Sequence, residues 1–423
     1  MNSKIYNNYI QILQEELVPA MGCTEPISIA YCAAKARSVL NKVPDKVLVE
    51  VSGNILKNVK SVIIPNTNGL KGIKAAVALG IIGGDETKVL EVISQVSDDK
   101  KEETRKYLET SDIQVKNTDG SEVLDIIVTV YKNTESAKVI ICRSHTNIVL
   151  IEKNGEVLYK NDTENQSVFQ KTNRNQLNVE QIIEFADTVD INDISSILSR
   201  QIEYNSNISN EGLNNDWGAN IGTVLLNVYG NDIKNRAKAA AAAGSDARMS
   251  GCELPVIINS GSGNQGMTCS LPVIEYSKEL HSTKEELIRA LVVSNLVTIH
   301  LKTGIGRLSA YCGAISAGAG AGAGIAYILG GRYKEVSHTI VNALAITSGI
   351  ICDGAKPSCA AKIAAAVDAG ILGYYMYKEG QQFRRGDGII TAGVENTIQN
   401  INRLGHDGMK ETDKEIISIM LEN

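Results

Sequence analysis

The sequence has few aromatic residues and no strongly basic stretch. Aromatic residues make up 4% of the 423 residues and include a single Trp, which leaves little side-chain surface for stacking on bases or sugars. The net charge is −6, and no long basic run is present, although phosphate backbones are bound by clustered Lys and Arg. These absences argue against nucleic acid as a partner.

Strongly apolar runs are also scarce. The most apolar one, Ala314–Gly331, consists of 18 residues that are mostly Ala and Gly. It is too weakly hydrophobic to predict a membrane span, so we interpret it as a tightly packed core helix. The first twenty residues are polar and amphipathic, unlike a signal peptide. We therefore expect a cytoplasmic protein with no membrane partner.

Several catalytic signatures are missing as well. The chain has no H-E-x-x-H or C-x-x-C metal pattern and no G-x-S-x-G elbow, and its Gly-rich loop is not followed by GK[ST]. It does have eight cysteines without a secretory context, which favours reduced thiols over a disulfide framework. Metal binding or catalysis by these cysteines is therefore the first question.

The periodicity predicts an α+β fold, with a mostly helical catalytic core and an inserted α/β module. We assign residues 1–45 to N-terminal helices of the core, 46–178 to the inserted module and 179–423 to the all-helical part of the core. Predicted helices cover 4–18, 27–40, 70–79, 87–96, 101–110, 179–186, 193–200, 221–243, 284–302, 314–329, 333–348, 358–372 and 410–421. Predicted strands cover 47–53, 59–65, 124–130, 137–142, 147–152 and 156–160, and the polar stretch 162–176 is expected to be a link.

Three cysteines stand near predicted helix ends. Cys352 and Cys359 flank a turn, and Pro357 can open the helix that follows, where free N–H groups favour a thiolate. Cys312 lies 40 residues before Cys352 in another glycine-rich stretch. Three thiolates can hold an iron–sulfur cluster and leave one iron open for a substrate. Inert buried thiols explain the spacing alone almost as well.

A fourth cysteine, Cys23, follows a Gly and precedes Thr24, a plausible N-cap. It is either a fourth ligand or an acid/base thiol whose pKa a helix N-terminus lowers towards neutrality, and the plainer alternative is a packed loop cysteine. The stretch Asn259–Gly266 and the similar 65–69 offer backbone N–H groups to an anion, although both could be simple tight turns. Lys302 and Arg307 flank Cys312 and could neutralise charge there.

Five motifs occur in the order found in one family. They are GCTEP at 22–26, SGNILKNVKSVIIPNTNG at 52–69, SDARMSGCELPVIINSGSGNQG at 245–266, HLKTGIGRLSAYCGA at 300–314 and ICDGAKPSCAAKIAAAVDAGILGY at 351–374. Over nearly its full length the chain resembles the L-cysteine desulfidase family, which is related to the iron–sulfur L-serine dehydratase alpha chain. The stretch 144–147 is similar to the SHT element of the dehydratase beta chain, which meets the substrate carboxylate.

The resemblance implies a [4Fe–4S] cluster that acts as a Lewis acid and is held by Cys312, Cys352 and Cys359. The spacing between the last two is shorter here than in the serine dehydratases. Cys23 is then expected to be an acid/base or substrate-contacting residue. The expected substrate-binding residues are Asn66, Thr67, Asn68, Gly69, His145, Thr146, Asn147, Ser260, Ser262 and Asn264.

The expected reaction is the non-redox β-elimination of L-cysteine to hydrogen sulfide, ammonia and pyruvate. L-Serine, which differs at one atom, is the nearest alternative substrate. A non-catalytic iron–sulfur sensor and a metal-free helical protein with inert thiols are alternatives of other classes. A homodimer is expected only from the general frequency of such oligomers.

Overall fold

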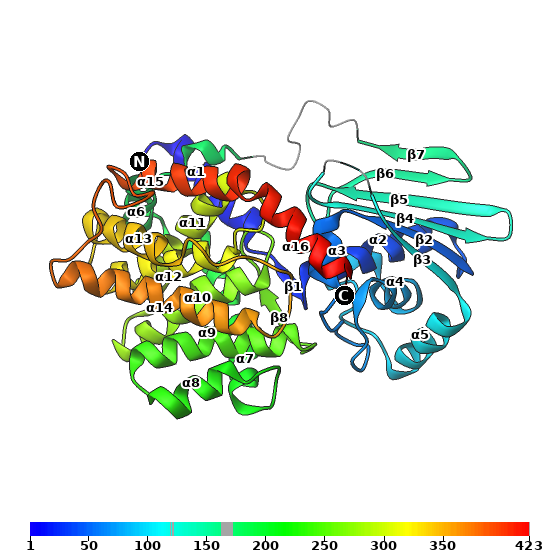
Figure 1. The fold of residues 1–423 in the computed structure, drawn as a ribbon, viewed down its shortest axis with the longest axis horizontal. Helices are drawn as coiled ribbons and strands as arrows, with labels where there is room; N and C mark the ends of the chain where they lie inside the picture. The colour runs from blue at the N-terminus through cyan, green and yellow to red at the C-terminus, as the bar shows by residue number, and fades with distance from the viewer. Residues whose placement is uncertain (119, 121, 162–171, 423) are drawn as a thin grey trace.

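The computed structural model describes all residues except 119, 121, 162–171 and 423. Most of the expected 162–176 link lies outside these described residues. The predicted fold class, α+β with a mostly helical core, is confirmed. Figure 1 shows two lobes side by side: a helical lobe, made of α1 and residues 172–408, and a sheet lobe, made of α2 and residues 46–160.

The α-helices are α1 (Ser3–Glu16), α2 (Thr24–Leu40), α3 (Gly53–Val59), α4 (Gly72–Gly83), α5 (Asp98–Thr110), α6 (Val179–Thr188), α7 (Ile191–Asn214), α8 (Ile221–Tyr229), α9 (Ile233–Met249), α10 (Gly263–Glu279), α11 (Lys284–Ile305), α12 (Gly313–Ile328), α13 (Tyr333–Thr347), α14 (Cys359–Lys378), α15 (Val394–Arg403) and α16 (Lys410–Glu422). The strands are β1 (Pro19–Met21), β2 (Lys46–Val51), β3 (Asp112–Asn117), β4 (Asp125–Lys132), β5 (Glu135–Cys142), β6 (Ile148–Lys153), β7 (Glu156–Lys160) and β8 (Pro255–Ile257).

The sheet lobe is built on a six-stranded sheet of order β3-β2-β4-β5-β6-β7, in which only the β2–β3 pair is parallel. Alternate residues of β4 and β5 are buried, as expected for strands with one face on a core. Helix α2 packs on these two strands and on α4. We had expected α2 in the helical core with α1, but α2 packs on the sheet and α4, whereas α1 packs against α7 and α11. Gly80 of α4 allows this close approach, because a Cβ there would lie 2.3 Å from the carbonyl oxygen of Ala30 in α2.

The helical lobe is organised around α12, which packs against α10, α11, α13 and α14. Its alternating Ala and Gly residues allow very close approach: a Cβ added at Gly318 would lie 2.4 Å from the carbonyl oxygen of Ala366, and one at Gly320 would lie 2.1 Å from Thr298 Oγ1. Gly322 meets Gly370 in the same way. In both contacts, the α14 residue lies the same number of positions along the chain from its α12 partner. The two helices therefore run parallel, and their N-termini lie at the same end.

A short two-stranded sheet joins the lobes. Strand β1 pairs antiparallel with β8, so the region that we predicted to be all-helical also contains a small sheet. This pairing holds the start of α2 next to the turn after β8. The three-residue strands are too short to be recognised from alternation in the sequence.

Other predicted elements were wrong in part. Residues 59–65 are not a strand: α3 ends at Val59, and only Ile63 forms an isolated bridge, with Lys71. Residues 87–96 are not an α-helix, because the 3₁₀ helix Glu86–Glu91 kinks at Val89. The predicted helix 221–243 is two helices, broken at Gly230 with φ +86°. Strand β3 and helices α10 and α15 were not predicted.

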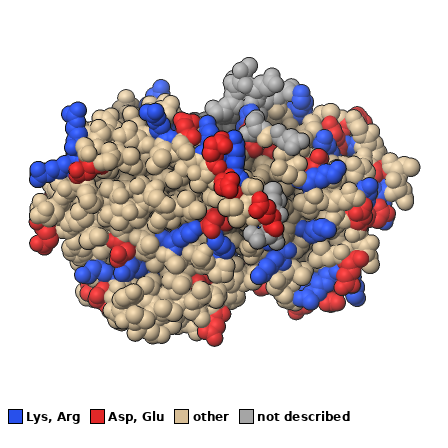
Figure 2. All heavy atoms as spheres, in the orientation of Figure 1, with Lys and Arg blue, Asp and Glu red and all other residues tan. Residues whose placement is uncertain are grey.

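Among the described residues, only α11 is long and apolar enough to cross a membrane, and 78% of its most apolar window is buried inside the fold. Burial of this kind is typical of a core helix. Figure 2 shows Lys and Arg interspersed with Asp and Glu over one face, with no continuous basic tract on it.

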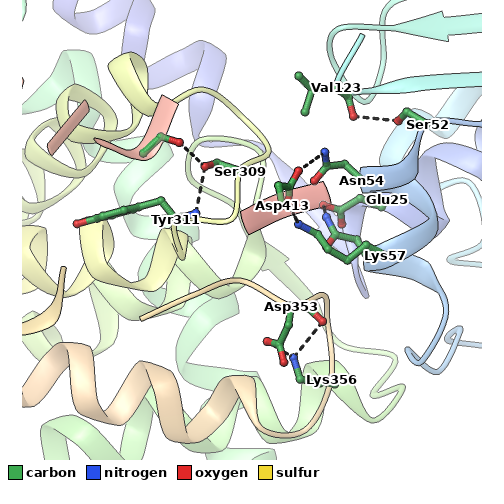
Figure 3. Close-up of polar contacts among 12 residues, drawn as sticks. Glu25, Ser52, Asn54, Lys57, Val123, Ser309, Tyr311, Asp353, Lys356 and Asp413 are labelled. Atoms are coloured by element: carbon green, nitrogen blue, oxygen red, sulfur yellow. Dashed lines mark hydrogen bonds and ion pairs between the residues drawn. The ribbon is translucent and has the colours of Figure 1, made fainter. Parts of the chain in front are cut away.

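The C-terminal helix α16 fastens the two lobes. Its Asp413 accepts hydrogen bonds from Lys57 at 2.5 Å and from Asn54 at 2.7 Å, and both donors belong to α3 (Figure 3). The Lys57 side chain is 1% exposed and that of Asp413 is 15% exposed. Burial of this pair makes it sensitive to the loss of either partner.

We expect Asp413→Ala to lower the free energy of unfolding by roughly 3 kcal/mol, because it leaves the Lys57 ammonium buried without its carboxylate. The matched control is Lys414→Ala, which removes a pair with Glu411 that is 72% and 83% exposed and should change stability by less than about 0.5 kcal/mol. Urea denaturation monitored by circular dichroism measures both. Equal effects would show that the Asp413 contact does not fasten α16.

Candidate active site

A cavity at the junction of the lobes contains most of the chemically reactive residues singled out above. The cavity volume is about 100 Å³, counted as space for the centres of water-sized molecules, and the cavity opens to solvent. The lining residues come from the start of α2, the end of α3, the β5–β6 connection, the end of α9, the turn 260–262 with the start of α10, and the segments 302–314 and 352–363.

Cys312, Cys352 and Cys359 all line this cavity. Cys312 is the N-cap of α12, and Cys359 is the first residue of α14, so the parallel packing of these helices brings the two thiols to the same end. An isolated bridge between Tyr311 and Ile351 lies beside them, flanked by hydrogen bonds from Cys312 N to Ile350 O at 3.3 Å and from Cys352 N to Ala310 O at 2.7 Å. All three cysteines are free thiols.

The loop between Cys352 and Cys359 is fixed by charge and by backbone packing. Asp353 forms ion pairs with Lys356 and Lys362 (the contact to Lys356 is seen in Figure 3). Gly354 has φ +94°, and a Cβ there would lie 2.4 Å from the carbonyl oxygen of Lys57, so only glycine fits. We expected Pro357 to open the helix, but α14 begins two residues later, at Cys359.

The environment of Cys312 and Cys359 disfavours free thiolates. Burial, followed by the neighbouring Cys352, raises the pKa of Cys312 to about 12. Burial also raises the pKa of Cys359. The ammonium of Lys302 is buried beside them, and burial lowers its pKa to about 8 although Cys352 and Cys312 oppose this. Without a compensating cation, three thiolates here would repel one another.

The donor set fits an iron–sulfur cluster. Among the described residues, no three His, Cys, Asp or Glu side chains converge as a single metal ion would require. A cluster takes each thiolate at a different iron, so three soft thiol ligands spread around one cavity suit it better than they suit a mononuclear ion.

Cys23 faces the same cavity from α2. It is the N-cap of that helix, so the expected N-cap, Thr24, is instead the first helical residue. The Cys23 thiol donates to Glu25 Oε2 at 3.0 Å, and Thr24 Oγ1 donates to the carbonyl of Gly261 at 2.8 Å. A Cβ at Gly22 would lie 2.5 Å from Pro65 Cγ, which shows how tightly the motif is held.

The pKa predicted for Cys23 was wrong in direction. We expected the helix N-terminus to lower it, but burial and the Glu25 charge raise the pKa of this thiol well above its ordinary value, and Arg248 only partly offsets them. The reason is that burial, together with the full charge of Glu25 that accepts the S–H hydrogen bond, outweighs the partial charge of the helix end. Cys23 is therefore a protonated thiol in this structure.

Glu25 is a buried carboxylate at the centre of a small polar cluster. Its Oε1 accepts a hydrogen bond from Asn58 at 3.1 Å and lies 3.8 Å from His145 Nε2. Burial would raise the pKa of Glu25, but the His145 ring and the Cys23 thiol outweigh this and lower it to about 2. The His145 ring is buried, and its Nε2 has no hydrogen-bond partner among the described residues.

The Gly- and Ser-rich stretch 259–266 is only in part a loop. Asn259 and Ser262 form an isolated bridge around Ser260, which has φ +51°, and α10 then begins at Gly263. Ser260, Ser262 and Asn264 all line the cavity, with Asn264 already inside the helix. The predicted binding stretch is therefore a turn followed by a helix N-terminus, because the glycines permit close packing as well as turns.

The other expected binding residues are not all brought to the cavity. His145 lines it, whereas Thr146 and Asn147 do not, and Asn147 donates instead to Cys142 O at 3.0 Å. The segment Asn66, Thr67, Asn68 and Gly69 also lies outside the cavity lining. Asn66 Nδ2 donates to Ile93 O at 2.7 Å and Thr67 Oγ1 to Ile64 O at 2.6 Å, so these side chains hold their own turn, next to Gly22.

Sequence reasoning missed four buried polar residues of the site: Glu25, Asn58, Arg248 and Gln265. Glu25 and Arg248 stand inside the motifs GCTEP and SDARMSG, so the motifs contained them. The burial of these charged residues could not be predicted. Arg248 lies in an Ala-rich segment of α9 in which polar and apolar residues do not separate into two faces, so the sequence does not show which side of the helix is buried.

Comparison with known proteins gives consistent results. Residues 86–418 match the family model of the serine dehydratase alpha chain. A UPF0597 protein of Desulfitobacterium hafniense (strain Y51) is 64% identical, covering 99% of this chain and 97% of that protein. UPF0597 proteins of Lachnoclostridium phytofermentans and Finegoldia magna are 53% and 48% identical, covering 99% and 98% of this chain and 100% and 99% of theirs.

We expect Gly354→Ala to destabilise the fold by about 2 kcal/mol or more, because alanine is strained at positive φ and its Cβ would collide with the α3 backbone. Gly349→Ala is the matched control, since Gly349 has open space around it and the change should alter stability by less than about 1 kcal/mol. Thermal and urea unfolding of the two variants measure the difference. A Gly354→Ala protein as stable as Gly349→Ala would contradict the close packing.

Glu25 gives a pH-dependent prediction. Its pKa is about 2 in the folded chain against 4.5 as the ordinary value, so its contribution to stability is present above pH 4.5 and is lost as the pH falls towards 2. The stability difference between wild type and Glu25→Gln should therefore be largest at pH 6 and shrink between pH 5 and pH 3. Denaturation at each pH measures it, and the exposed Glu102→Gln variant should show no such trend.

Proposed function

Because the chain belongs to the serine dehydratase alpha chain family, a lyase-type family that is generally iron–sulfur dependent, we propose that it converts L-cysteine and water to hydrogen sulfide, ammonia and pyruvate. The observation that carries the proposal is the meeting of Cys312, Cys352 and Cys359 with the separate thiol of Cys23 at one cavity. The proposed binding site lies between the helical lobe and the inserted α/β module.

Cys312, Cys352 and Cys359 would hold a [4Fe–4S] cluster. When bound, the cluster would supply an open iron that acts as a Lewis acid towards the sulfur of the substrate. The buried Lys302 ammonium stands beside two of these cysteines, and it would offset part of the negative charge of the thiolates. Glycine at position 354 and the Asp353 ion pairs keep the ligand loop in place.

In the reaction the Cα–H and Cβ–S bonds break, and an aminoacrylate forms that tautomerises and is hydrolysed by water to pyruvate and ammonia. Cys23 is the proposed acid/base residue. Because its thiol is protonated and hydrogen-bonded to Glu25, it would donate that proton to the departing sulfide, and the proton that leaves Cα would restore the thiol. Glu25 stays ionised and orients the thiol. His145 and the Ser260–Asn264 segment would contact the substrate.

L-Serine with loss of water is the second candidate, and the family match favours it. The soft sulfur atom of L-cysteine favours cysteine as the substrate, because sulfur binds iron more readily than a hydroxyl does. A non-catalytic iron–sulfur sensor would not need the buried Cys23–Glu25 pair.

The test is an anaerobic assay of the reconstituted protein with L-cysteine and L-serine in parallel, following pyruvate and sulfide. We expect pyruvate and sulfide from cysteine, and a loss of at least about 100-fold in rate together with loss of iron in Cys352→Ala, because the Lewis acid is no longer held. Cys142→Ser is the control, since Cys142 does not line the cavity, and it should keep both iron and rate.

Pyruvate from serine alone would move the assignment to a serine dehydratase. An intact cluster without pyruvate from either amino acid would refute the proposed reaction and favour the sensor.

A further inference from the structure

Arg248 is a buried cation without a carboxylate partner. It stands in the last turn of α9 and is 2% exposed. Across the described part of the chain, no Asp or Glu forms an ion pair with it, whereas the buried Lys57 and Arg174 each pair with an acidic side chain. The negative end of α9 offsets only part of the cost of burying this charge. The position therefore calls for an anion from outside the protein.

The guanidinium is fixed so that one edge stays free. Its Nη1 donates to Asn264 Oδ1 at 3.0 Å. A Cβ at Gly263 would lie 2.3 Å from Arg248 Nε and 2.7 Å from Cζ, so the guanidinium packs directly against the first residue of α10. Nε and Nη2 are both buried and have no hydrogen-bond partner among the described residues.

These two nitrogens share one edge of the guanidinium, and this edge is the one that binds both oxygens of a carboxylate in parallel hydrogen bonds. Arg248 lines the cavity with Cys23, and its charge acts on that thiol. An anion on the free edge would therefore lie close to the proposed acid/base residue and within the same cavity as the three cysteines.

A second unpartnered group completes the arrangement. Gln265 is 5% exposed, lines the cavity, and its Oε1 has no hydrogen-bond partner within the described residues. Its side chain packs on Gly313, where a Cβ would lie 2.7 Å from Gln265 Cδ, next to Cys312. A free amide oxygen is an acceptor for an ammonium group. Together, a free guanidinium edge and a free acceptor match the two charged ends of an α-amino acid.

We infer that Arg248 binds the α-carboxylate of the amino-acid substrate through its Nε and Nη2 edge, with Gln265 accepting from the α-ammonium group. The inference rests on the proposed function for the identity of the substrate. It assigns the carboxylate to a side-chain cation from α9, in place of the Asn66–Gly69 segment, which lies outside the cavity. It also explains why position 263 is glycine, since any side chain there would displace the guanidinium.

The experiment measures binding without turnover. L-Alanine, which has no leaving group, and ethylamine, which has no carboxylate, are titrated into the anaerobically reconstituted holoenzyme by calorimetry. We expect Arg248→Gln to lower the affinity for L-alanine by about 100-fold, since a bidentate charged contact is lost, and to leave ethylamine binding unchanged. Arg248→Lys keeps the positive charge but cannot form the two parallel hydrogen bonds, so it should recover part of the affinity that Arg248→Gln loses.

Kinetics with L-cysteine give a second readout. If Arg248 acts mainly by binding, Arg248→Gln raises KM far more than it lowers kcat. Arg236→Gln is the matched control: Arg236 lies on the same helix, forms a surface contact with Glu279 and is not part of the cavity. It should leave both L-alanine binding and KM unchanged.

Asn264→Ala provides a second route if Arg248→Gln does not fold, because it frees the guanidinium without removing the charge, and it should weaken L-alanine binding by about 10-fold. A folded, iron-replete Arg248→Gln protein with wild-type affinity for L-alanine would overturn the inference. Loss of L-alanine binding in a protein whose wild type makes no pyruvate would instead support the carboxylate site and refute the proposed reaction.

Discussion

The close parallel packing of α12 on α14 is the constraint on which the candidate site depends. Cys312 is the N-cap of α12 and Cys359 is the first residue of α14, and the glycines of α12 allow its backbone to contact that of α14 at Gly318 and Gly322. A Cβ at either glycine would push the helices apart. Because the separation and register of the two helices set the separation of their first residues, the glycines also decide whether Cys312 and Cys359 can share a cavity. The cost of glycine in a helix is accepted here for close packing.

A second constraint is the burial of charge where the lobes meet. Glu25, Arg248 and Lys302 are all less than 10% exposed. Asn58, His145 and Cys23 surround Glu25 and keep it ionised. Arg248 and Lys302, in contrast, have no acidic partner among the residues that the structure describes. The cavity is thus electropositive on the side of the helical lobe. An anionic ligand set and an anionic substrate would complete the charge balance that the protein leaves open.

The segments that support the site are as specific as those that line it. The turn at 65–69 packs on Gly22, and the backbone of α3 packs on Gly354. The sheet lobe therefore holds both Cys23 and the Cys352–Cys359 loop, although few of its own side chains enter the cavity. The residues 66–69, expected to touch substrate, serve as this support. Their sequence resembles a binding loop because turns that bind anions and turns that brace a neighbour use the same Gly, Asn and Thr chemistry.

The sequence by itself determined the fold class, most helices longer than three turns and the four cysteines of interest, because helical periodicity and motif order are local properties. It did not determine that Cys23 is protonated, that α2 packs on the sheet, or that α10 begins inside the Gly- and Ser-rich stretch. It also did not separate His145, which lines the cavity, from Thr146 and Asn147, which do not. Burial and the neighbours of each charge decide these points. Burial and charge pairing arise from contacts between residues far apart in the chain. Arg248 contacts Gly263 on another helix, and Glu25 lies near His145 in the β5–β6 connection. Only the tertiary structure brings such residues together.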